Sequence, residues 1–96
     1  MKVHNLKLNE EFADAILSGE KSFEIRENDR GFQKGDHIVF RVIKPNAVFN
    51  EAVNHPLKDK EFEIGYVING WGLENGYVAF SIREVAVMRE EANDGR

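Results

Sequence analysis

Alternation of apolar and polar residues is the feature of this sequence that most narrows its possible folds. It is clearest in residues 61–68, whose apolar side chains share one face of an extended segment: Phe62, Ile64, Tyr66 and Ile68. Similar segments cover 3–8, 21–26, 37–43, 77–82 and 85–88, the last two nearly continuous. Turns rich in Gly, Asn and Asp separate them. The pattern predicts a sheet of about five or six short strands that curls into a small, fully or partly closed β-barrel.

One helix is predicted after the first strand. Asn9 is suited to the N-cap, where its side chain would accept a hydrogen bond from the first turn, and two glutamates follow it. The next apolar residues fall on one helical stripe: Phe12, Ala13, Ile16 and Leu17. Gly19 ends the helix. Residues 44–60 are predicted to form a long loop with room for one short helical turn. The fold class is therefore α+β, mainly β, with one or two short flanking helices.

A chain of 96 residues has room for one core, so we predict one domain over 1–88 and a charged, disordered tail over 89–96. No disulfide framework is possible because the chain contains no cysteine. Neither a signal peptide nor a bilayer-spanning run is recognisable, so a cytoplasmic protein is expected, with no membrane partner. The net charge of -4 argues against broad binding to duplex nucleic acid, but it leaves room for a compact basic pocket.

The densest polar group in the sequence lies between Lys21 and Arg30. Period-two geometry places Ser22, Glu24 and Arg26 on one face of a strand and directs Phe23 and Ile25 to the other, apolar face. A carboxylate two residues from an arginine orients the guanidinium, which can then bind a phosphate, a carboxylate or a base edge. The alternative is a solvated strand face that carries weak ion pairs.

Aromatic and histidine residues give weaker indications. Trp71 lies between two glycines, so its ring can either point outward for base stacking or cover the core. Other aromatic residues are assigned to the core or its edge: Phe12, Phe23, Phe40, Phe62, Phe80, Tyr66 and Tyr77. The three histidines lack metal-ligand spacing, and His4 is expected to make a plain hydrogen bond at a strand end. We therefore expect no metal and no cofactor.

A family resemblance sharpens this interpretation. Residues 19–26, Gly-Glu-Lys-Ser-Phe-Glu-Ile-Arg, resemble the G-x-K-x-x-E-x-R signature of ASCH domains, a branch of the PUA-like superfamily. The similarity extends through 28–36 and includes 4–8 and the glycine-rich turn before Tyr77, but not 44–60. It resembles a small bacterial and phage branch in which the domain stands alone. The resemblance implies a β-barrel with a cleft for RNA or nucleotide-like ligands, lined by Lys21, Glu24 and Arg26, with Arg30 beside them.

Three functions follow as hypotheses. The first is a module that binds RNA, a nucleotide or a modified nucleoside through Lys21, Ser22, Glu24, Arg26, Arg30 and Trp71. The second is a small hydrolase acting on a modified nucleoside or RNA, with Lys21 and Glu24 as catalytic residues. ASCH amidohydrolases that act on acetylated cytidine are similar at Lys21 and Arg26, but they have a threonine in place of Glu24. The third is a protein-interaction accessory module that uses the acidic second half and the loop 44–60.

Overall fold

Six strands form one mixed sheet in the computed structural model, which describes residues 1–45 and 49–86. The strands are β1 (Val3–Asn9), β2 (Phe23–Glu27), β3 (His37–Pro45), β4 (Asn50–Ala52), β5 (Glu61–Asn69) and β6 (Tyr77–Val85). One α-helix, α1 (Glu10–Leu17), and one 3-10 helix, η1 (Pro56–Asp59), accompany them. The predicted mainly β class with short flanking helices is confirmed. Residues 87–88 and the predicted tail, 89–96, lie outside the described residues.

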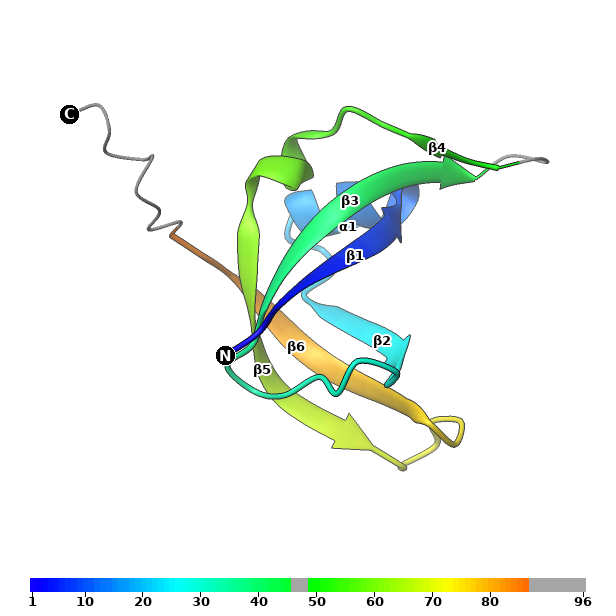
Figure 1. Cartoon of the computed structure of the whole chain (residues 1–96), viewed down its shortest axis with the longest axis vertical. Coiled ribbons are helices and arrows are strands. Elements are labelled where there is room, and N and C mark those ends of the chain that lie inside the picture. The colour runs from blue at the N-terminus through cyan, green and yellow to red at the C-terminus, as the bar shows by residue number, and fades with distance from the viewer. Residues whose placement is uncertain (46–48, 87–96) are drawn as a thin grey trace.

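The sheet is strongly curved but open. Its order is β1-β3-β5-β6-β2, with β4 added to β3, and only the β1–β3 pair is parallel. Curvature brings the two outer strands, β1 and β2, round to face each other (Figure 1). No backbone ladder joins β1 to β2 within the described residues, so the predicted closure into a barrel is wrong. Hydrogen bonds to β1 come from the side chains of Arg26, in the five-residue strand β2, and of Arg30, in the loop that follows it.

The apolar core lies inside this curved sheet, and α1 packs against β1 and β3. Predicted core residues Phe40, Phe62 and Phe80 are buried in it. A bulge between Ile64 and Val67 interrupts the alternation of β5, which leaves Tyr66 exposed instead of at the core edge. A Cβ on Gly65 at that bulge would lie 2.3 Å from the Ser81 hydroxyl oxygen, so a larger residue would force the Ser81 side chain to turn away.

Local signals at α1 were partly correct. The helix follows Asn9 and ends just before Gly19, whose φ of +87° is a left-handed conformation that glycine adopts without strain. The Asn9 side chain makes no capping hydrogen bond, so that part of the prediction is wrong. Phe12 and Leu17 are also more exposed than their apolar stripe predicted, and the buried residues of that stripe are Ala13 and Ile16.

The predicted loop 44–60 contains more regular structure than expected. It includes the expected helical turn as η1, and also the short strand β4, which the weak sequence pattern did not indicate. His55 anchors this segment: its Nδ1 accepts from the Leu57 backbone N–H, so Nε2 carries the proton and donates to Asp14 of α1 at 2.8 Å. Among the residues described, no helix has the length and apolarity needed to cross a membrane.

Candidate functional site

The sequence predicted that the apolar face of strand β2 would turn toward the core, but its polar face does. Phe23 and Ile25 are 47% and 53% exposed, whereas Glu24 is buried. The cause is the register with β6, in which Glu24 pairs with Phe80 and Arg26 with Val78. Residues directly opposite in an antiparallel pair share a face, so the inward side chains of β6 turn Glu24 and Arg26 inward as well. The assignment of Phe23 to the core is therefore wrong.

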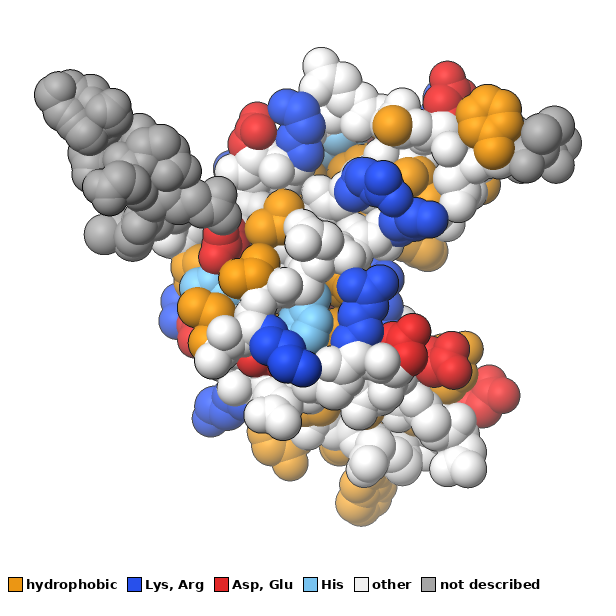
Figure 2. Space-filling model, viewed as in Figure 1, with side chains coloured by type: hydrophobic (Ala, Val, Ile, Leu, Met, Phe, Trp, Pro, Cys, Tyr) orange, Lys and Arg blue, Asp and Glu red, His pale blue; other side chains and the backbone are white. Residues whose placement is uncertain are grey.

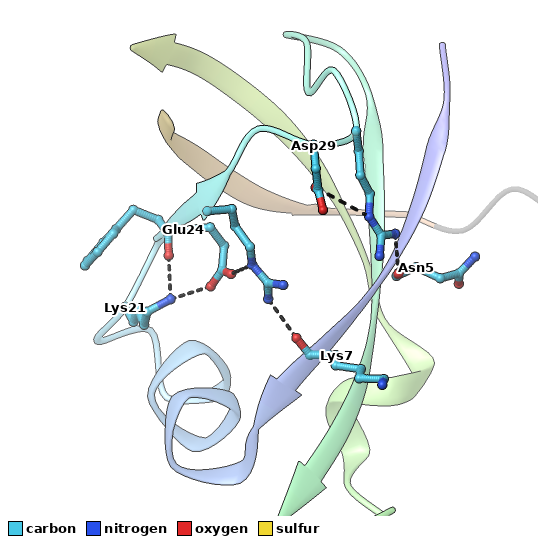
Figure 3. Close-up of polar contacts among 8 residues, drawn as sticks. Asn5, Lys7, Lys21, Glu24 and Asp29 are labelled. Carbon is cyan, nitrogen blue, oxygen red and sulfur yellow. Dashed lines mark hydrogen bonds and ion pairs between the residues drawn. The ribbon is translucent and has the colours of Figure 1, made fainter. Parts of the chain in front are cut away.

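Burial of Glu24 is balanced by two cations. Its Oε1 accepts a hydrogen bond from Arg26 Nε at 2.8 Å, and its Oε2 accepts one from Lys21 Nζ (Figure 3). Lys21 Nζ also donates to the Phe23 carbonyl oxygen at 2.7 Å. The side chain of Glu24 is 3% exposed, that of Lys21 17% and that of Arg26 24%. We call Lys21, Glu24 and Arg26 the ion triad, because one buried carboxylate holds both cations in place.

Two arginine side chains cross the gap between β1 and β2, the outer strands of the open sheet. Arg26 Nη2 donates to the Lys7 carbonyl oxygen at 2.8 Å, and Arg30 Nη1 donates to the Asn5 carbonyl oxygen at 2.9 Å. Both acceptors belong to the free edge of β1 (Figure 3). Guanidinium groups therefore satisfy edge carbonyls that a neighbouring strand would satisfy in a closed barrel.

A pocket of about 550 Å³ opens beside this gap, and we call it the edge pocket. The ion triad forms part of its wall, together with apolar side chains of α1 and β2: Phe12, Phe23 and Ile25. Lys21 Nζ lies 5.5 Å from the ring centre of Phe12 and 5.0 Å from that of Phe23, within cation–π range of both. Figure 2 shows the molecule hollowed between the β1 side and the β2 side. A mostly apolar wall with a few fixed polar groups is typical of a small-molecule site.

None of the remaining predicted site residues lines the edge pocket. Ser22 is exposed and does not line the edge pocket; its carbonyl oxygen accepts a hydrogen bond from Ile82 N. Arg30 lines an adjoining cleft instead. Trp71 is 90% exposed in the turn between β5 and β6, with φ at +52°, and it too lies off the pocket wall. The alternative that Trp71 covers the core is wrong.

Several pocket residues carried no recognisable functional signal in the sequence. Phe12, Phe23 and Ile25 fit apolar stripes, and such stripes normally indicate core positions. Lys7 contributes its backbone carbonyl to the fixing of Arg26, a role that no side-chain pattern records. The juxtaposition of Phe12 with Phe23 around Lys21 could have been suggested only by the short connection between α1 and β2.

A second buried polar pair lies away from the edge pocket. His4 Nε2 is 2.9 Å from Asp36 Oδ2, which is the strand-end hydrogen bond expected for this histidine. Burial raises the pKa of Asp36, but hydrogen bonds from His4 and from the backbone N–H groups of Lys2 and Gln33 outweigh it and hold that pKa below its usual range. Within residues 1–45 and 49–86, no three His, Cys, Asp or Glu side chains are grouped to hold a metal ion.

Comparison with known proteins identifies the family. Over a stretch of 38 residues, the chain is 37% identical to the "Uncharacterized 12.9 kDa protein in GpA 3'region" of Escherichia phage P2. That stretch is 40% of this chain and only 35% of the phage protein. A family model matches far more of the chain, from residue 3 to residue 82. The chain therefore belongs to the family described as "Domain of unknown function (DUF3850)".

Proposed function

We propose that this protein binds RNA, a nucleotide or a modified nucleoside in the edge pocket. The observation that carries the proposal is the ion triad in the pocket wall, where the buried Glu24 holds Lys21 and Arg26 beside two partly exposed phenyl rings. Pre-positioned cations reduce the ordering cost of binding a polar ligand. Exposed rings beside them suit a ligand with a flat apolar face.

A nucleobase meets both requirements. It can stack on Phe12 or Phe23, a contact worth about 1–3 kcal/mol per base, while its polar edge or an attached phosphate meets Lys21 and Arg26. Arg26 engages protein acceptors only through Nε and Nη2 among the described residues, so further N–H groups of its guanidinium can donate to a ligand. The role of Glu24 in this proposal is to orient the two cations.

The ASCH resemblance supports the same location. Its signature residues Lys21, Glu24 and Arg26 are the residues of the ion triad, and all three line the edge pocket. We propose on this basis that the family is related to the ASCH branch of the PUA-like superfamily. An open, curved sheet with a helix beside it is compatible with that relationship.

The hydrogen bonding and burial of Glu24 support a binding function over the alternative of a hydrolase. Both of its carboxylate oxygens accept hydrogen bonds, and its side chain is almost wholly buried. A general base must reach the proton that it abstracts from a substrate. The geometry of Glu24 is better suited to holding Lys21 and Arg26 than to moving a proton.

A thermal-shift screen of nucleosides, modified nucleosides such as acetylated cytidine, and nucleotides tests the proposal. A ligand at a hundredfold excess over its dissociation constant should stabilise the wild type by about 2.7 kcal/mol. Lys21→Ala should lose this stabilisation, whereas Lys60→Ala should keep it, because Lys60 pairs with Glu84 outside the pocket. Phe23→Leu, which removes the ring but keeps apolar bulk, should weaken binding of a stacked base. No stabilisation by any ligand, or equal behaviour of the two lysine variants, would refute the proposal.

A further inference from the structure

A second concave surface adjoins the edge pocket, and its lining is basic. It has a volume of about 550 Å³, and six residues line it: Asn5, Leu6, Lys7, Arg26, Arg30 and Arg41. We call it the basic cleft, since four of these side chains are cationic and no described carboxylate lines it. Figure 2 shows Lys and Arg side chains collected over β1 and β3 and beside β2. This concentration is unexpected in a chain with a net charge of -4.

Two of the four cations of the basic cleft, Lys7 and Arg41, have no ion-pair partner among the described residues. The other two are paired, Arg26 with Glu24 and Arg30 with Asp29. Lys7 and Arg41 are partners in the β1–β3 register, so two like charges are neighbours on adjacent strands. Such an arrangement opposes folding. An anion bound between them would remove this repulsion.

Two of the three arginines of the cleft are already held in position. Hydrogen bonds to the carbonyl oxygens of Lys7 and Asn5 fix the guanidinium groups of Arg26 and Arg30. Each guanidinium carries five N–H donors in a planar fork, and these bonds use only some of them. A fixed fork with remaining donors matches the paired oxygens of a phosphate group.

The basic cleft and the edge pocket share two lining residues, Lys7 and Arg26, so the two cavities lie next to each other. We infer that the basic cleft binds backbone phosphate of a single-stranded RNA whose base occupies the edge pocket. This inference rests on the proposed function and extends it, because it makes an oligonucleotide a better ligand than a nucleoside. A base must be unstacked to enter such a pocket, which favours a single strand over a duplex.

Affinity measurements at several salt concentrations test the inference. The probes are homo-octamers of uridine, cytidine and adenosine, the corresponding nucleosides, and an octa-glutamate peptide. Arg41→Gln removes one cation of the cleft, and Arg83→Gln is the matched control, since Arg83 is an exposed strand residue outside both cavities. We expect Arg41→Gln to weaken octamer binding and to reduce the slope of log K against log salt by about 0.7, the value for one phosphate contact on a single strand. Arg83→Gln should match the wild type.

The outcomes separate this inference from the proposed function. If Lys21→Ala weakens nucleoside binding but Arg41→Gln and Arg83→Gln give the same octamer slope, the basic cleft does not bind phosphate and the edge pocket still binds the base. If the wild type binds none of the nucleosides and none of the octamers, both proposals fail. If octa-glutamate binds as tightly as the octamers, the cleft recognises negative charge in general, and its assignment to RNA phosphate is overturned.

Discussion

Replacement of Glu24 by Gln is the sharpest test of the ion triad, because it changes charge while keeping side-chain shape. The carboxylate accepts from Lys21 through one oxygen and from Arg26 through the other. An amide has one oxygen and one NH2 group. Whichever way the glutamine side chain is turned, one of the two cations then faces a donor instead of an acceptor.

The expected loss of stability can be built from these two contacts. A hydrogen bond to a charged group contributes about 1.5–3 kcal/mol, and a neutral one about 0.5–1.5 kcal/mol. Glu24→Gln removes one charge-assisted bond and weakens the other. Water can solvate part of the released cations, since Lys21 and Arg26 are 17% and 24% exposed. We therefore expect the free energy of unfolding to fall by about 2 kcal/mol, which corresponds to roughly 8–16 °C in Tm for a domain of this size.

Urea unfolding followed by circular dichroism measures this difference. With a slope near 2 kcal/mol per molar urea, the midpoint should fall by about 1 M. The control is Glu84→Gln, which removes the carboxylate of an exposed pair with Lys60 and should cost about 0–1 kcal/mol. A cost for Glu24→Gln of less than about 0.5 kcal/mol, equal to that of a surface ion pair, would refute the view that a buried carboxylate organises the site.

Two further predictions concern residues outside the edge pocket. Because the folded-state pKa of Asp36 is lowered, its stabilising contribution is complete above the unfolded value of about 3.9 and is lost as pH falls through the folded value. Asp36→Asn should therefore cost more stability at pH 6 than at pH 2.5 in denaturant titrations, and an equal cost at both would contradict this. Trp71→Asn should change the free energy of unfolding by no more than about 0.5 kcal/mol, since the ring is exposed and asparagine tolerates a positive φ. A loss above 1 kcal/mol by the same measurement would show that the ring covers the core.

Local pattern was enough to predict most elements of the fold and the residues of the ion triad. Alternating segments indicated β1, β2, β3, β5 and β6, and the stripe that ends before Gly19 indicated α1. The spacing of Lys21, Glu24 and Arg26 within one short segment marked a charged cluster. These predictions succeed because they depend on residues that are neighbours along the chain.

Tertiary structure alone decided which face of β2 turns inward and how the site is completed. Alternation shows that Glu24 and Arg26 share a face, but only the pairing with Phe80 and Val78 of β6 turns that face inward. The openness of the sheet likewise depends on contacts between β1 and β2, where Arg26 reaches a carbonyl 19 residues away in the sequence. The physical reason is that period-two geometry specifies relative orientation within a strand, whereas burial is specified by what packs against it.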